Sequence, residues 1–81
     1  MNATDIAQRL VTALEGAALR ESGAAAPLVS VNIDVLTHGS AGAVETEVLR
    51  KTRTLLFLRA TLADGAGAPL ATASSVHKLE G

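Results

Sequence analysis

Apolar and polar residues alternate along several segments of the chain, the pattern that is typical of β-strands. In Leu28–Leu36, valine and isoleucine occupy the odd positions from Val29 to Val35, while Ser30, Asn32 and Asp34 lie between them. This alternation predicts a strand with one buried and one wetter face. Glycine-containing turns separate this segment from the later ones. The predicted strands cover about residues 28–36, 43–51, 54–63 and 70–79.

The segment Thr54–Leu62 is apolar on both of its alternating sides over most of its length. A strand of this kind has neighbours on both edges and cover on both faces. We therefore expect it to be the central strand of the sheet, with Phe57, the only aromatic residue, buried in the middle of it. The face that carries Phe57 also carries Arg59 and Thr61, so we expect it to be only partly buried toward the end of the strand.

The first part of the chain, about residues 2–22, has helical rather than strand periodicity. Its apolar stripe consists of Ile6, Leu10, Ala13, Leu14 and Ala17. Asn2 and Thr4 are both suitable N-caps, and Gly23 is the natural C-cap. Gly16 inside the helix costs roughly 1 kcal/mol relative to alanine, and we interpret it as a site of close packing.

One helix followed by four sequential strands predicts an α+β fold with an antiparallel sheet. The 81 residues form a single domain, residues 1–81. Its apolar residues are largely Ala, Val and Leu, which bury little area each, so the core of a monomer is thin and marginal. We therefore expect a homo-oligomer, a dimer or a tetramer.

Charge and composition exclude several classes of function. The net charge is −1 and there is no aromatic stacking platform, so we expect no nucleic-acid partner. No apolar run approaches the ~20 residues that span a bilayer, and no signal-peptide layout precedes the helix, so we expect no membrane association and a cytoplasmic location. There is no cysteine, and His38 and His77 lack metal-ligand spacing, so we expect no metal or cofactor, and surface positions for both histidines.

Three segments in the last two-thirds of the chain resemble hotdog-fold thioesterases, and within them the phenylacetate-pathway type of acyl-CoA thioesterase. Ile33–Gly42 resembles that family's strand and turn after its long helix. Glu45–Phe57 resembles its next strand, basic turn and central strand. Asp64–Ser74, ending Pro-Leu-Ala-Thr-Ala-Ser, resembles its final turn and last strand. The resemblance implies a curved sheet around a helix, and an acyl-CoA site at a dimer interface near the helix N-terminus of one subunit.

The helix departs from the family pattern. The family's His-Gly-Gly falls on Ala3–Asp5, and its catalytic Asp or Glu falls on Thr12, or on Val11 if the loop differs by one residue. Neither residue can act as a carboxylate base or nucleophile. Glu15, three residues after Thr12, is the alternative base, or else a solvated surface carboxylate. The strands that precede the helix in most relatives have no counterpart in this sequence.

The only basic cluster is Arg50, Lys51 and Arg53, at a turn that lies near the CoA nucleotide in the family. These side chains suit phosphate binding, although solvated turn charges would have the same pattern. Two functions remain open. The first is an acyl-CoA thioesterase-like protein, a hydrolase with weak or displaced catalysis. The second is a non-catalytic hotdog domain that binds an acyl or CoA-like ligand or serves in assembly.

Overall fold

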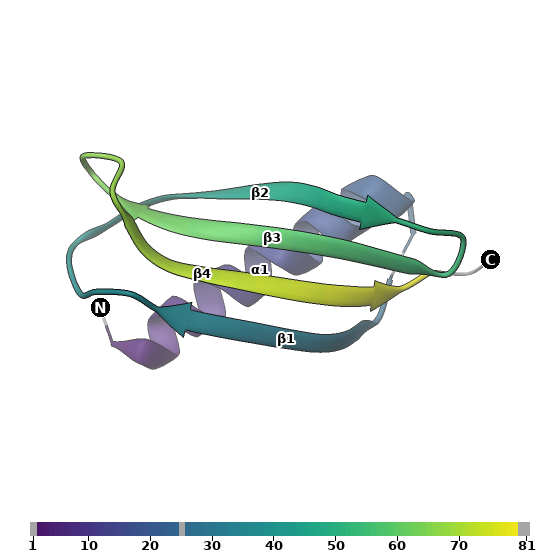
Figure 1. Cartoon of the computed structure of the whole chain (residues 1–81), viewed down its shortest axis with the longest axis horizontal. Helices are drawn as coiled ribbons and strands as arrows, with labels where there is room; N and C mark the ends of the chain where they lie inside the picture. The colour runs from purple at the N-terminus through teal and green to yellow at the C-terminus, as the bar shows by residue number, and fades with distance from the viewer. Residues whose placement is uncertain (1, 25, 80–81) are drawn as a thin grey trace.

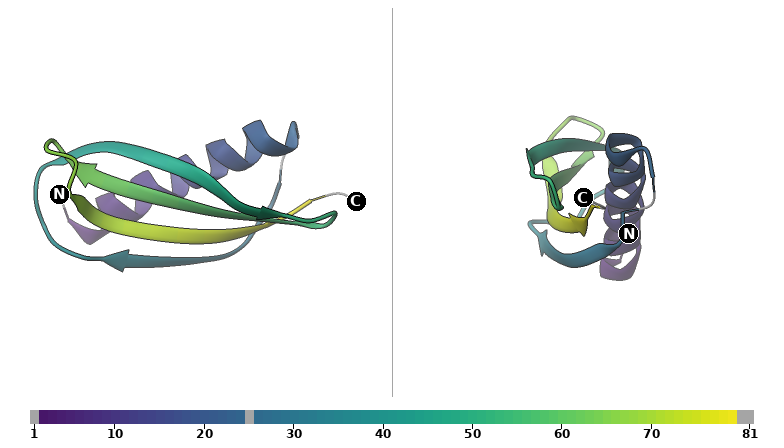
Figure 2. Two further views of the ribbon diagram at one scale, coloured as in Figure 1. Left: turned by 45° about the horizontal axis from the view of Figure 1, so that its top comes forward. Right: turned by 90° about the vertical axis from the view of Figure 1, so that its right-hand side faces the viewer.

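A computed structural model describes residues 2–24 and 26–79. One helix, α1 (Ala3–Ser22), is followed by β1 (Leu28–Val35), β2 (Ala41–Lys51), β3 (Leu55–Asp64) and β4 (Pro69–Lys78) (Figure 1). The helix lies across one face of the sheet, which curves around it (Figure 2). The predicted fold class, one long helix on a four-stranded antiparallel sheet, is confirmed. Element ends differ from the predicted ones by one or two residues, most at the start of β2.

The sheet has the strand order β1-β4-β3-β2, and all neighbours are antiparallel. β3 lies between β4 and β2, which confirms Thr54–Leu62 as a central strand. β1 and β2 are the two edges of the sheet (Figure 1). Both edge strands have irregular pairing, at Leu28/Ser30 in β1 and at Ala41/Val44 and Val48/Arg50 in β2.

Both ends of α1 are capped by the residues that the sequence indicates. Asn2 is the N-cap, and its side-chain oxygen accepts a hydrogen bond from the Asp5 N–H at 2.9 Å. Gly23 is the C-cap, with φ of 73°, and its N–H donates to the Leu19 carbonyl at 2.9 Å. A left-handed backbone at this position is why glycine ends the helix.

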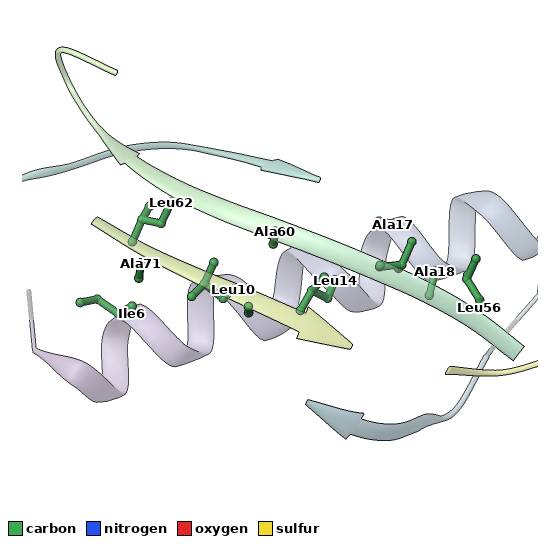
Figure 3. Close-up of a cluster of buried hydrophobic side chains, with 11 residues drawn as sticks. Ile6, Leu10, Leu14, Ala17, Ala18, Leu56, Ala60, Leu62 and Ala71 are labelled. Atoms are coloured by element: carbon green, nitrogen blue, oxygen red, sulfur yellow. The ribbon is translucent and has the colours of Figure 1, made fainter. Parts of the chain in front are cut away.

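The core lies between α1 and the inner face of the sheet, the face turned toward the helix. Large leucines from both layers alternate there with alanines, which let the helix approach the sheet closely (Figure 3). Its buried residues are Ile6, Leu10, Leu14, Ala17, Ala18, Leu56, Leu58, Ala60, Leu62, Ala71 and Ala73. The predicted apolar stripe of the helix is therefore the face that packs on the sheet.

Phe57 is not part of this core. In β3 the alternate residues Leu56 and Leu58 face the helix, so Phe57 lies on the outer face, opposite Val76 of β4, and is only half-buried. The expectation that the single aromatic residue is buried was wrong, because both sides of this strand are apolar and only one of them is covered by a second layer.

His77 is fully buried, so its expected surface position was also wrong. It lies on the inner face of β4, where its Nδ1 is 3.2 Å from the Ala26 carbonyl oxygen and its Nε2 is 2.8 Å from Ser75 Oγ. A carbonyl only accepts, so Nδ1–H is the donor, and in the neutral ring Nε2 then accepts from the Ser75 hydroxyl. These bonds fasten the segment before β1 to the sheet.

Ser75→Ala is expected to destabilise the protein by about 1–3 kcal/mol, because it leaves a buried imidazole nitrogen without a partner. Ser74→Ala is the matched control: Ser74 is the preceding residue of the same strand, but it is exposed on the outer face. It should change stability by no more than about 0.5 kcal/mol. Urea unfolding of both variants at one protein concentration measures the difference, and equal values would show that the Ser75–His77 bond contributes nothing.

Candidate functional site

The exposed face of α1 carries the two helix residues that the sequence singles out. Thr12 and Glu15 are both exposed, on the side of the helix that turns away from the sheet. Residues three apart are neighbours on a helix surface, so a hydroxyl and a carboxylate lie one turn apart there. Val11, the alternative to Thr12, is half-buried.

Glu15 also borders a hollow of about 410 Å³ between the second half of α1 and the segment that leads into β1. The other lining residues are apolar or small: Gly16, Leu19, Ala26 and Pro27. Leu19 is 54% exposed, so an apolar side chain at the edge of the hollow is open to solvent. A carboxylate at the rim of an apolar hollow is the kind of arrangement that binding sites use to orient a largely apolar ligand.

Gly16 has a different role from the predicted close packing. A side chain added at Gly16 would meet only the end of the flexible Arg20 side chain, at 3.4 Å. Nothing therefore packs tightly against this glycine, and its missing side chain helps to leave the hollow open. The glycine inside a helix was the available sequence signal for this site, but Leu19, Ala26 and Pro27 carried none.

The basic cluster lies where β2 turns into β3. Lys51 binds the end of the helix: its Nζ is 3.7 Å from Glu21 Oε1 and donates to the Glu21 carbonyl oxygen at 3.2 Å. Arg50 and Arg53 are exposed and form no ion pair within residues 2–24 and 26–79. Of the three predicted cations, the two arginines are thus the ones available to a phosphate.

The basic turn and the start of α1 lie at opposite ends of the molecule, whose longest dimension is 40 Å (Figure 1). Arg9, in the first half of α1, donates from Nη2 to the Gly42 carbonyl oxygen at 2.8 Å, which ties the helix to the start of β2. The basic turn follows the end of the same strand. One chain therefore does not bring Arg50 and Arg53 to the helix N-terminus.

Gly42, at the start of β2, allows that strand to approach the end of β3 closely. A side chain at this position would lie 2.8 Å from the Asp64 carbonyl oxygen, a clash that could be removed only by moving the backbone.

A second hollow, of about 540 Å³, lies on the outer face of the sheet beside Gly42 and is lined among others by Glu45, Thr61 and Asp64. Asp64 Oδ1 already accepts from the Ala66 and Ala68 N–H groups at 2.9 Å each, so this carboxylate serves the β3–β4 turn.

Within the described part of the chain, no three His, Cys, Asp or Glu side chains are grouped as metal ligands would be. Nor does any described helix combine the length and apolar character needed to cross a membrane.

Comparison with known proteins identifies the class of fold. The structure is similar to an X-ray structure of a protein from the thioesterase superfamily, with a TM-score of 0.84 and 16% sequence identity. The similarity covers 99% of this chain and 62% of that one, so this chain spans less than two-thirds of its length. The chain therefore has the hotdog fold that the resemblance implied. No family model matches the sequence, and no curated protein does.

Proposed function

We propose that the chain is an acyl-CoA thioesterase-like hotdog protein with weak or displaced catalysis. The observation that supports this most is Glu15, a carboxylate at the rim of an apolar hollow and one helical turn from Thr12, where the family's acid falls. The apolar lining suits an acyl chain, and a carboxylate within reach of the thioester suits activation of water.

In the proposed reaction Glu15 removes a proton from water as the water oxygen attacks the thioester carbonyl carbon. The C–S bond then breaks, and the CoA thiolate takes up a proton as it leaves. Glu15 is exposed, so bulk water surrounds its carboxylate and the site does not exclude solvent from the reacting groups. Slow turnover follows from this setting.

Candidate partners for the phosphates of CoA lie at the same end of the chain as the hollow. The basic turn lies beside the end of α1, because Lys51 Nζ donates to the Glu21 carbonyl oxygen and is 3.7 Å from Glu21 Oε1. The hollow is lined by residues of that same half of the helix. The proposal therefore places the acyl group in the hollow, with Arg50 and Arg53 to bind the phosphates.

The decisive experiment compares hydrolysis of a panel of acyl-CoA and aryl-CoA esters by the wild type and Glu15→Gln, with a thiol reporter. We expect slow wild-type turnover that Glu15→Gln reduces by about 10²-fold or more. Glu47→Gln is the matched control, because it removes the same charge from an exposed position on the outer face of the sheet. Equal turnover by all three proteins would rule out Glu15 as the base.

A non-catalytic function is the second candidate, and Thr12 favours it: a hydroxyl stands where the family has its acid. In that case the hollow and the arginines bind an acyl or CoA-like ligand without reaction. Calorimetry with acyl-CoA would then detect binding in the absence of turnover. Gly16→Leu should weaken that binding, because the new side chain would enter the hollow.

A further inference from the structure

The outer face of the sheet, turned toward the viewer in Figure 1, carries the single phenylalanine of the chain beside a cation. Phe57 of β3 lies opposite Arg50 of β2 on one side and opposite Val76 of β4 on the other. Residues directly opposite each other in an antiparallel pair point to the same face, with Cβ atoms about 4.5–5.5 Å apart. Phe57 is therefore bordered by a guanidinium on one strand and an apolar side chain on the next.

Lys78 adds a second cation at the end of β4. It pairs with Leu55 of β3, and its neighbour His77 is buried on the inner face, so Lys78 points to the outer face. Lys78 is two residues from Val76, the partner of Phe57, which gives it a diagonal position at about 7–8 Å that a long side chain can span. We name this surface the Phe57 patch and define it by Leu55, Phe57 and Val76 together with Arg50 and Lys78.

The cations of the Phe57 patch are available to an anion. Arg50 and Lys78 are both exposed, and among the described residues neither forms an ion pair. Glu47, further along the outer face of β2, is paired with Arg59 at 3.3 Å. Phe57 is half-buried, so part of its ring is in contact with solvent. The patch thus combines an accessible aromatic ring with two positive charges that no carboxylate of the described residues pairs with.

We propose that the Phe57 patch binds an adenine nucleotide, either free or as the nucleotide part of CoA. The base stacks on the phenylalanine ring, as bases do on aromatic side chains, and Leu55 and Val76 flank it. The phosphates lie between Arg50 and Lys78, where the guanidinium can donate two parallel hydrogen bonds. The patch has one ring, so it suits one base rather than a strand of nucleic acid, whose successive bases stack on several rings.

The composition of the patch favours a nucleotide over other occupants of this face. A purely apolar partner would cover Arg50 and Lys78 without pairing them, and unpaired charges are costly to remove from water. A simple anion would use the cations and gain nothing from the ring. An adenine nucleotide carries a flat aromatic ring and a charged group on one small molecule, so it contacts both parts of the patch.

The inference does not depend on hydrolysis at Glu15. The hollow beside Glu15 lies along α1, whereas the Phe57 patch is on the face of the sheet turned away from that helix. The two are at the same end of the sheet, because Pro27, which lines the hollow, accepts a hydrogen bond from the Lys78 N–H at 2.9 Å. Arg50 is shared with the proposed function, so a free nucleotide and the nucleotide of acyl-CoA would compete for it.

The first test uses the wild type, because the chain has one phenylalanine and neither tyrosine nor tryptophan. Apart from the two histidine rings, Phe57 therefore gives the only aromatic side-chain signals in the proton NMR spectrum. Titration with ADP should shift the Phe57 ring signals, because the ring current of a stacked base acts on the protons beneath it. Pyrophosphate, which has the charge but no base, should leave them nearly unmoved. Equal shifts with both ligands, or no shift with ADP, would overturn the proposal.

Substitutions of Phe57 test the stacking contact in calorimetry with ADP. Phe57→Leu keeps an apolar side chain but removes the ring, so it should weaken ADP binding about fivefold or more. Phe57→Tyr keeps a ring and should retain the wild-type affinity. An unchanged affinity in Phe57→Leu, with the variant folded by its NMR spectrum, would rule out a stacked base. If Phe57→Leu does not fold, loss of the ring-signal shift in the wild type on replacing ADP with pyrophosphate decides the question alone.

A charge substitution tests the phosphate contact. Arg50→Gln should weaken ADP binding about threefold or more and leave adenosine binding unchanged, because adenosine has no phosphate. Arg59→Gln is the matched control: it removes the same charge from the same face, at a residue already paired with Glu47. Equal weakening by the two variants would show a general charge effect and contradict the site.

Competition identifies the source of the nucleotide and separates this inference from the proposed function. Displacement of ADP by acyl-CoA assigns the patch to the nucleotide of CoA, whereas simultaneous binding of both assigns it to a free nucleotide. ADP binding that depends on Phe57, in a protein that hydrolyses no acyl-CoA, would refute the proposed function and support the patch. Hydrolysis of acyl-CoA by a protein that binds neither ADP nor adenosine would do the reverse.

Discussion

Leu10→Ala is expected to destabilise the protein by about 2–5 kcal/mol, a large part of the stability of a domain of this size. Leu10 is fully buried in the middle of α1, against the inner face of β3 and β4 (Figure 3). The cost includes the lost transfer free energy of its side chain and the cavity that remains. Neighbours such as Ala60 and Ala71 are short, so they cannot reach into the vacated space.

Leu19→Ala provides the comparison within the same helix, since Leu19 is 54% exposed and outside the core. It should change stability by about 0.5 kcal/mol or less. Both variants should be unfolded in urea at one protein concentration, because association shifts apparent stability. A loss below about 1 kcal/mol for Leu10→Ala would mean that the helix can move toward the sheet and close the cavity.

The arrangement of helix and strands could be predicted because local periodicity decides it. Period-two alternation from Val29 to Val35 can place its apolar side chains on one face only as a strand. The stripe through Ile6, Leu10 and Leu14 can do so only as a helix. Turn residues such as Gly23 then mark where one element ends.

The face on which each residue of a central strand lies could not be predicted in the same way. In β3 both alternating sets are apolar, so nothing in the segment itself indicates which set meets the helix. Leu56 and Leu58 do so, and Phe57 lies on the outer face. The burial of His77 depends on the Ala26 carbonyl oxygen, 51 residues away in sequence, and on the Ser75 hydroxyl. Contacts of that range leave no local pattern.

The candidate site is predictable only in part, for a related reason. Glu15 was singled out by its spacing from Thr12, but the hollow beside it is formed by a loop and a helix that are brought together by folding. The basic turn was recognised from its charges, and its position at the far end from the start of α1 depends on the direction of β2 (Figure 1).

Thr12→Asp is expected to raise hydrolysis of acyl-CoA esters by about 10²–10⁴-fold over a slow wild type, the usual contribution of a positioned acid–base group. Thr12 is exposed on the same face of α1 as Glu15, so a carboxylate can replace it without entering the core. The resemblance places the family's acid at this position, and in this chain the N-terminal half of the helix is held by the Arg9–Gly42 hydrogen bond and the Asn2 cap. Backbone N–H groups at a helix N-terminus can polarise a thioester carbonyl, and a carboxylate at position 12 would add to the weak base that Glu15 supplies.

Thr12→Asn is the matched control, because it has nearly the shape of aspartate but cannot accept a proton from water. The gain should therefore appear in Thr12→Asp and be absent from Thr12→Asn, in the turnover number measured by thiol release at saturating acyl-CoA. Calorimetry should show equal affinity of both variants for the ligand, since the substitution changes the chemical step rather than the arginines or the hollow. If both bind acyl-CoA and neither hydrolyses it, the lost acid is not what limits the reaction, and ligand binding without chemistry becomes the better account of this fold.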